Sequence, residues 1–411
     1  MTSVNIPPLH GAFYPIRYEE ESGFFDMTAR KILTRDFTLC FLAQFVFSSV
    51  FFILIPTIPI YLSRLGVTKA GIGILVGALS VSSLMLRPLV GRALSKIPER
   101  NFMIAGSLLY AFSSMGYLIA KPFWPFFIVR IFQGIGLALF ATASFTLVAR
   151  ISPEAHRGQS LGYFYLAINI AFALAPSLGI AIINLLDFNI LFLICAGLSL
   201  CALFIAMRLG KQESIPPEES AEKQPLLSRE TLPPAIMAFM GSFIWGAITA
   251  FISLYALHHG VANPGPFFTA LAVTLILGRG LGGKILDIYS REKVLFPCLA
   301  AQIIAMTILA FSTTLPMFIL VAIIWGTGNA FFYPTLVAYA IDLAESSKGS
   351  AIGTYMALSD FGTGMGAVMM GIVLQLSNYP IMFLCLALTA TINLYYFYSF
   401  TRRRKSQLAN P

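Results

Sequence analysis

Long apolar blocks alternate with short polar connections along most of the chain. Twelve such blocks stand near residues 38–62, 70–91, 102–120, 123–149, 158–184, 188–208, 233–257, 265–286, 294–312, 316–341, 350–376 and 380–400. An α-helix needs about 20 mostly apolar residues to cross the hydrocarbon core of a bilayer. Because a backbone in lipid must satisfy its own hydrogen bonds, the blocks predict helices and exclude open strands. The pattern therefore predicts an all-α polytopic membrane protein with twelve transmembrane helices.

Composition excludes a soluble protein. Of the 411 residues, 57% are hydrophobic and only 11% are charged, whereas soluble domains carry about 25% charged residues. The five cysteines all fall inside predicted helices without the spacing of metal ligands, so they are expected to be packing residues.

The basic residues are distributed by side of the membrane. An excess of 27 Lys and Arg over 18 Asp and Glu can indicate a nucleic-acid partner, but here 21 of the basic residues fall in alternate loops and in the terminal segments. The loops on the other side carry Arg64, Lys69 and Lys121. The positive-inside rule then predicts that both termini are cytoplasmic. We expect a multi-pass protein of the plasma membrane, which is the inner membrane if the source is a bacterium, with no nucleic-acid partner.

Two six-helix halves are expected on either side of one polar segment. The segment 210–232 is rich in Glu, Ser and Pro and is typical of a flexible linker. It divides a bundle at 37–209 from a bundle at 233–400, with a cytoplasmic segment 1–36 before them and a basic cytoplasmic tail 401–411 after them. Six is an even number, so both halves enter the membrane with the same orientation.

The halves repeat each other in sequence. Arg87 and Gly91 match Arg279 and Gly283 at an offset of 192 residues (279 − 87), and "SPEAHRGQSLGYFYLA" at 152–167 resembles "LAESSKGSAIGTYMAL" at 343–358. In the second match Gly162 and Gly353 are 191 residues apart. Parallel repeats of this kind enclose a central cavity near the bilayer midplane.

The loop after the second helix of each half carries a family motif. The segments "GRALSKIPER" and "GKILDIYSRE" resemble the G-x-L-x-D-R-x-G-R-R loop of the major facilitator superfamily, although Ser95 replaces its aspartate in the first copy. The resemblance covers about residues 36–400 and implies two pseudo-symmetric six-helix bundles with a cytoplasmic gate. The alternative is that the basic residues serve only to orient the chain. The residues assigned to the gate are Arg87, Gly91, Ser95, Arg100, Arg279, Gly283, Asp287 and Arg291.

Two further motifs resemble the drug/proton antiporter branch of the family. "RIFQGIG" matches its R-x-x-Q-G-x-G pattern through Arg130 and Gln133, which share one helix face. "ALAPSLG" keeps Pro176 and Gly179 of its G-P-x-x-G pattern as a helix bend, with alanine in place of the first glycine. Arg130 is expected to face the cavity and take part in proton coupling. The alternative is that it donates to backbone carbonyls between helices.

Asp360 is the one acid deep inside a predicted helix. Ionisable residues within the membrane are costly and mark functional sites, so Asp360 is the expected proton carrier. The alternatives are a permanent ion pair with an arginine and a hydrogen bond between helices.

Polar and aromatic residues recur on single faces of several helices. This lining suits a small amphiphilic or aromatic solute, although an aromatic residue in such a place is more often a packing residue. The residues expected to bind the solute are Gln44, Gln133, Asn169, Trp245, Trp325, Asn329 and Tyr333.

The sequence favours transport over catalysis. It has no Walker A motif, and His258 and His259 have no acid or cysteine nearby for a metal site. We expect a monomeric, non-enzymatic secondary transporter without cofactor or metal, whose partners are the solute, protons and the lipid bilayer. Proton-coupled efflux by alternating access is the leading hypothesis. Proton-coupled uptake and a non-transporting receptor or scaffold of the same fold are the alternatives.

Overall fold

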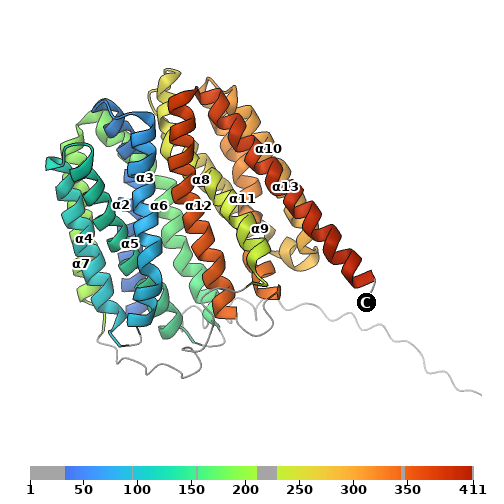
Figure 1. Cartoon of the computed structure of the whole chain (residues 1–411). Helices are drawn as coiled ribbons and strands as arrows, with labels where there is room; N and C mark the ends of the chain where they lie inside the picture. Colours follow the sequence, from blue (N-terminus) through green and yellow to red (C-terminus); the bar gives the residue numbers. More distant parts are fainter. Residues whose placement is uncertain (1–32, 95, 154–155, 211–228, 344–347, 410–411) are drawn as a thin grey trace, which may run out of the picture.

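Twelve α-helices make up the described part of the chain (Figure 1). The computed structural model describes residues 33–94, 96–153, 156–210, 229–343 and 348–409, and among these it omits the side chains of 157–158, 281–287, 348–350 and 403–409. The helices are α2 (Arg35–Arg64), α3 (Lys69–Ala93), α4 (Glu99–Ile119), α5 (Trp124–Ile151), α6 (Arg157–Leu185), α7 (Phe188–Met207), α8 (Leu232–His258), α9 (Gly265–Ile288), α10 (Arg291–Ala310), α11 (Leu315–Leu343), α12 (Lys348–Leu376) and α13 (Tyr379–Ala409).

The prediction of an all-α polytopic membrane protein is confirmed. Eleven of the helices in the described ranges are long and apolar enough to cross a bilayer, and the described apolar part of α9, Gly265–Gly280, is shorter. One boundary differs from the prediction: α13 continues to Ala409, so the basic segment expected as a tail is helical as far as that residue. Lys and Arg are good helix formers, so the charges do not end the helix.

Helix ends follow the capping residues in the sequence. The side chains of Thr34, Thr68 and Asp187 accept backbone N–H groups at the starts of α2, α3 and α7. Gly66 and Gly260, which follow α2 and α8, adopt the left-handed conformation with φ of 76° and 77°. Glycine takes this conformation without a steric penalty and closes a helix C-terminus. Equivalent turns in the two halves thus use the same chemistry.

The helices form two bundles, α2–α7 and α8–α13 (Figure 1). An ion pair of 2.8 Å joins Glu99 of α4 to Arg150 of α5, and one of 3.2 Å joins Arg291 of α10 to Asp342 of α11. Each member of the second pair lies 192 residues after its counterpart, and the charges are exchanged. The contact has therefore been kept in both halves while its polarity has been reversed.

Helices α2 and α8 begin at the same end of the molecule, which we call the basic end. Five arginines lie there, namely Arg92, Arg100, Arg150, Arg208 and Arg291. The other end, which carries the α2–α3 and α8–α9 turns, is the opposite end. Both bundles span the distance between these ends (Figure 1).

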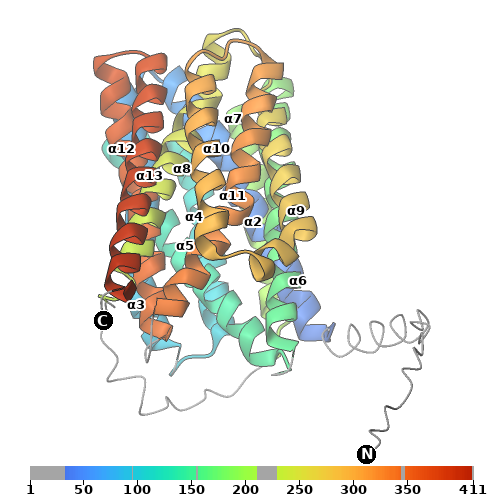
Figure 2. The ribbon, with the colours of Figure 1, turned by 90° about the vertical axis from the view of Figure 1, so that its right-hand side faces the viewer.

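The two halves pack closely toward the opposite end. A Cβ added to Gly73 of α3 would collide with the carbonyl oxygen of Ala367 in α12, and one added to Gly77 would lie 2.7 Å from the carbonyl oxygen of Gly364. On the other side of the molecule α6 lies beside α9 (Figure 2), and Thr269 donates a 3.0 Å hydrogen bond to the Ala173 carbonyl. Small residues allow such close approach between transmembrane helices.

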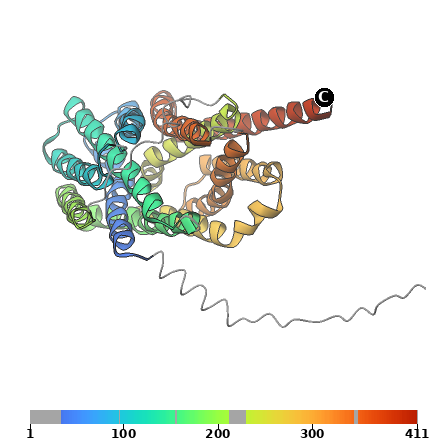
Figure 3. The same cartoon turned by 90° about the horizontal axis from the view of Figure 1, so that it is seen from below.

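The same pairs of helices separate toward the basic end, the end nearest the viewer in Figure 3. Side chains added at Gly91 of α3, Gly162 of α6, Gly280 of α9 or Gly353 of α12 would meet no atom within 4 Å. The interface between the halves is therefore tight toward the opposite end and open toward the basic end.

Candidate functional site

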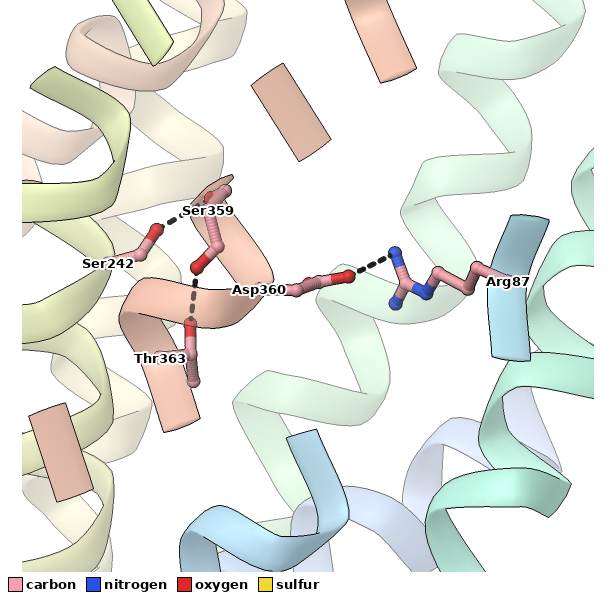
Figure 4. A network of polar contacts seen from close by, with 5 residues as sticks. All are labelled: Arg87, Ser242, Ser359, Asp360 and Thr363. Atoms are coloured by element: carbon pink, nitrogen blue, oxygen red, sulfur yellow. Dashed lines mark hydrogen bonds and ion pairs between the residues drawn. The ribbon is translucent and has the colours of Figure 1, made fainter. Parts of the chain in front are cut away.

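An ion pair between the two halves lies where α3 and α12 begin to separate. The Arg87 Nη1 atom of α3 is 2.8 Å from the Asp360 Oδ2 atom of α12, and the two side chains are 33% and 27% exposed (Figure 4). The expected proton carrier thus contacts a residue that the sequence assigned to the gate. Asp360 has no ion pair or hydrogen bond with Arg130 within the described ranges, so the pairing alternative matches the geometry, with Arg87 as the partner.

Hydroxyl groups surround the Asp360 backbone on its other side. The Ser242 and Ser359 hydroxyls are 2.6 Å apart, and Thr363 donates to the Ser359 carbonyl oxygen at 3.2 Å (Figure 4). The sequence analysis missed Ser359 and Thr363. Ser359 and Thr363 are four residues apart, on either side of Asp360 in the sequence, so they share one helix face. That spacing could have identified them as polar residues of the site.

A cavity of about 280 Å³ opens beside these hydroxyls, within the carboxyl-terminal half. Among the residues expected to bind the solute, Trp245, Asn329 and Tyr333 line it. Arg279, which the sequence assigned to the gate, also lines it, with an exposed side chain. The complete lining is Ser242, Trp245, Leu275, Arg279, Asn329, Tyr333, Ser359 and Thr363.

A second, smaller cavity of about 60 Å³ lies between the halves and includes Arg130 and Gln133. Trp245 and Thr363 line both cavities. The smaller cavity thus lies between the halves, next to the larger cavity in the carboxyl-terminal half.

Arg130 and Gln133 clamp α5 to α3 and α4. The Arg130 guanidinium donates to the Leu75 and Val76 carbonyl oxygens of α3 at 2.9 and 3.2 Å, and to the Gln133 side-chain oxygen at 2.8 Å. Gln133 also accepts from the Tyr117 hydroxyl of α4. The geometry thus matches the alternative of an arginine bonded to backbone carbonyls, because each of its three side-chain nitrogen atoms donates a hydrogen bond within one half.

The two glycines of the same motif are packing positions. A Cβ at Gly134 would collide with Leu79 and Ser82 of α3, and one at Gly136 would lie 2.9 Å from the Gly106 carbonyl oxygen of α4. In the second motif, Pro176 lies inside α6, and a Cβ at Gly179 would lie 3.0 Å from the Ile53 carbonyl oxygen of α2. Both motifs therefore hold the amino-terminal bundle together.

Three residues expected to bind the solute lie away from the described cavities. Gln44 is buried and hydrogen-bonded to Ser48 and Ser144 at 2.8 and 2.7 Å. Trp325 is 1% exposed and packs behind Trp245. Asn169 of α6 is partly exposed. Gln44 and Trp325 are therefore packing residues in this conformation, because neighbouring helices cover them completely.

The six expected gate residues other than Arg87 and Arg279 fall into three groups. Arg100 donates to the Met207 carbonyl oxygen within its own half, and Arg291 pairs with Asp342 within the other. A Cβ added to Gly91 would meet no atom within 4 Å, so this glycine makes no close helix contact at the level where the halves separate. Ser95 lies outside the described residues, and at Gly283 and Asp287 only the backbone of α9 is described.

The sequence profile of the Major Facilitator Superfamily matches residues 40–285 and 265–411. The chain belongs to this superfamily. Among its relatives is the "Staphylopine export protein" of Staphylococcus aureus, 25% identical over 372 residues, which cover 84% of this chain and 91% of the relative. The "Quinolone resistance protein NorA" of the same organism is 23% identical over 335 residues, which cover 78% of this chain and 84% of that one.

Solved structures of the superfamily share the fold. The nucleoside transporter NupG matches with a TM-score of 0.73 at 14% identity, over 89% of this chain and 99% of NupG. A POT family transporter matches with a TM-score of 0.74 at 13% identity, over 90% of this chain and 96% of that one. These matches confirm the superfamily fold that the loop motifs predicted.

Proposed function

We propose that this superfamily member exports a small amphiphilic solute in exchange for protons by alternating access. The observation that carries the proposal is the Arg87–Asp360 ion pair, which bridges the two halves beside the cavity. Such exchange needs a carboxylate that changes charge where the two halves move against each other, and Asp360 is a carboxylate in that place. The similarity to an export protein and to a drug-resistance protein supports the outward direction.

The basic end faces the cytoplasm in this proposal, because basic loops are retained on that side. The described conformation is then open to the cytoplasm and closed to the outside. A proton released into the cytoplasm leaves Asp360 ionised, and the ionised carboxylate pairs with Arg87. The pair is therefore the one expected after proton release and before the solute leaves.

Proton binding from the outside reverses the formation of the Arg87–Asp360 pair. Protonated Asp360 no longer attracts Arg87, so the bridge between α3 and α12 is lost when the outward-open state accepts a proton. The halves then return to the cytoplasm-open state without the solute. Arg130 has a supporting role here, because it keeps α3 attached to α5 while α3 moves against α12.

Transport by the full-length chain in proteoliposomes tests the proposal. The probe is a fluorescent quinolone, because a relative is a quinolone resistance protein. We expect the probe to accumulate in acid-inside vesicles beyond empty liposomes, and Asp360→Asn to abolish the excess. Accumulation driven by an acid exterior would instead establish uptake by symport. Equal accumulation with and without a gradient, in the wild type and D360N alike, would contradict proton-coupled export and favour a non-transporting scaffold.

A further inference from the structure

We infer that Arg279 binds an anionic group of the exported solute, which makes the solute an aromatic or amphiphilic anion such as an aryl carboxylate. The inference rests on the proposed function for its transport direction. The binding site itself follows from the charges and shape of the cavity. Arg279 occupies α9 at the position equivalent to Arg87 of α3, 192 residues later.

Arg279 is a cation without a counter-ion among the described residues. It makes no ion pair or hydrogen bond with any of them, and its side chain is exposed to the cavity that it lines. The other polar groups of that lining are hydroxyls and one amide, from Ser242, Ser359, Thr363, Tyr333 and Asn329. A cation within a transmembrane helix is costly unless it is paired, so an anionic ligand supplies what the lining lacks.

The pseudo-symmetry of the fold shows where a carboxylate for Arg279 would be expected. Arg87 pairs with Asp360 of α12 across the α3–α12 interface. The position equivalent to Asp360 on the other side is Asn169 of α6, at the offset of 191 residues that relates Gly162 to Gly353. An amide there is uncharged, so α6 offers Arg279 no carboxylate. One diagonal of the repeat carries a complete ion pair, and the other carries an arginine with no counter-ion in the described ranges.

The carboxylates of α11 and α12, Asp342 and Asp360, are already engaged. Asp360 is held by Arg87 at 2.8 Å, and Asp342 by Arg291 at 3.2 Å. The phenol groups of Tyr165 and Tyr333 are within electrostatic range of the Arg279 guanidinium, but neutral phenols do not balance its charge. Arg130 donates only to uncharged oxygen atoms, so the central region of the described structure keeps a net positive charge. A negative group on the solute lowers that charge where Arg279 lines the larger cavity.

The remainder of the cavity fits an aromatic body. The Trp245 ring faces the cavity and packs against Trp325, with ring centroids 5.2 Å apart and an interplanar angle of 32°. The volume of about 280 Å³ is close to the lower limit for pockets that take drug-sized ligands. A guanidinium can bind a carboxylate through two parallel hydrogen bonds, while Trp245 contacts the attached ring.

Quenching of tryptophan fluorescence tests the site without a pH gradient. The full-length chain carries three tryptophans, and Trp124→Phe leaves Trp245 and Trp325 as reporters beside the cavity. The probes are 4-nitrobenzoate and the neutral 4-nitrobenzyl alcohol, which share one quenching ring. We expect saturable quenching by 4-nitrobenzoate, with at least about tenfold weaker binding in Arg279→Gln. Arg279→Lys should lose less affinity because it keeps the charge, and binding of the alcohol should be the same in all three proteins.

Arg87→Gln is the matched control, because it removes the same charge from the equivalent position. A smaller loss of 4-nitrobenzoate affinity in R87Q than in R279Q supports the assignment. Equal losses in both variants would show an effect of net charge and would overturn it, as would equal affinity of the wild-type chain for the two probes. Since no gradient is needed, Arg279-dependent binding together with gradient-independent transport would refute proton-coupled export and leave the anion site standing.

Discussion

Arg87 of α3 and Asp360 of α12 connect the two halves of the protein by an ion pair of 2.8 Å. The pair lies on the side of the α3–α12 interface that opens toward the basic end, below the glycines at which the same helices touch. A charge on Asp360 is thereby linked to the relative position of the two bundles. In the proposed exchange, this linkage couples the proton to the change of access.

Removing one partner of the pair should affect transport and stability differently from removing both. Asp360→Asn should lower gradient-driven transport by at least about tenfold, because the asparagine cannot carry a proton. Arg87→Gln leaves a carboxylate unpaired, and should lower the free energy of unfolding by about 1–2 kcal/mol, between the values for exposed and buried pairs. The double variant R87Q/D360N should be more stable than R87Q in thermal unfolding. A double variant no more stable than R87Q would show that the unpaired Asp360 carboxylate carries no cost, contrary to this prediction.

Gly73 should control closure toward the opposite end. Gly73→Val places a branched side chain against the Ala367 carbonyl, and overpacking costs about 1–3 kcal/mol. We expect the closed population to fall by about tenfold and transport to fall with it. Closure is measured by disulfide formation between cysteines placed at Lys69 and Gln375, whose backbone nitrogen and side-chain oxygen are 2.9 Å apart.

The glycine prediction has a control within the same protein. Gly197 of α7 has no atom within 4 Å of an added Cβ, so Gly197→Val should form the disulfide as readily as the parent. Both substitutions are made in a chain whose five natural cysteines are replaced by alanine. Equal disulfide yields in G73V and G197V would refute the role of Gly73 in closure.

Arg130 should support transport by stabilising the fold of the amino-terminal half. Arg130→Gln removes three hydrogen bonds that tie α5 to α3 and position Gln133, and should lower the free energy of unfolding by about 3 kcal/mol. Arg130→Lys should recover little, because an ammonium group cannot span two carbonyls and an amide as the planar guanidinium does. Thermal unfolding in detergent measures the effect. A fully stable R130Q that cannot transport protons would instead place Arg130 in the coupling step.

The exchanged ion pairs predict that polarity can be reversed in the amino-terminal half. Glu99 is 3% exposed in its pair with Arg150, so Glu99→Gln should cost about 3 kcal/mol by removing a buried charged partner of Arg150. The double variant Glu99→Arg with Arg150→Asp copies the arrangement of Arg291 and Asp342. It should regain most of that stability, less about 0.3–1 kcal/mol for a cation at the start of α4. A double variant as unstable as E99Q would show that the local packing is specific for one polarity.

Local pattern predicted the helices and the repeat well. Apolar runs of the right length form α2–α13, and capping residues such as Thr68 and Asp187 mark the helix ends. The faces of single helices were also predictable, since Arg130 and Gln133 do lie together. Spacing along one helix is a local property, so it can be deduced from neighbouring residues alone.

The partners of the polar residues could not be predicted in the same way. Arg87 and Arg279 have the same place in the repeat, yet one pairs with Asp360 and the other faces a cavity. Gln44 has the spacing of a cavity residue, but it is fully bonded between α2 and α5. These outcomes depend on which helix of the other half, or of the same half, packs against each face.

The sequence by itself determined that the chain crosses a membrane with a duplicated bundle of helices, because hydrophobic length and loop motifs act locally and do not require knowledge of the partner helices. Only the tertiary structure decided that Asp360 meets Arg87, that Arg130 holds α3, and that Arg279 has no counter-ion among the described residues. These relationships arise where glycines let the helices of the two halves touch toward one end and separate toward the other.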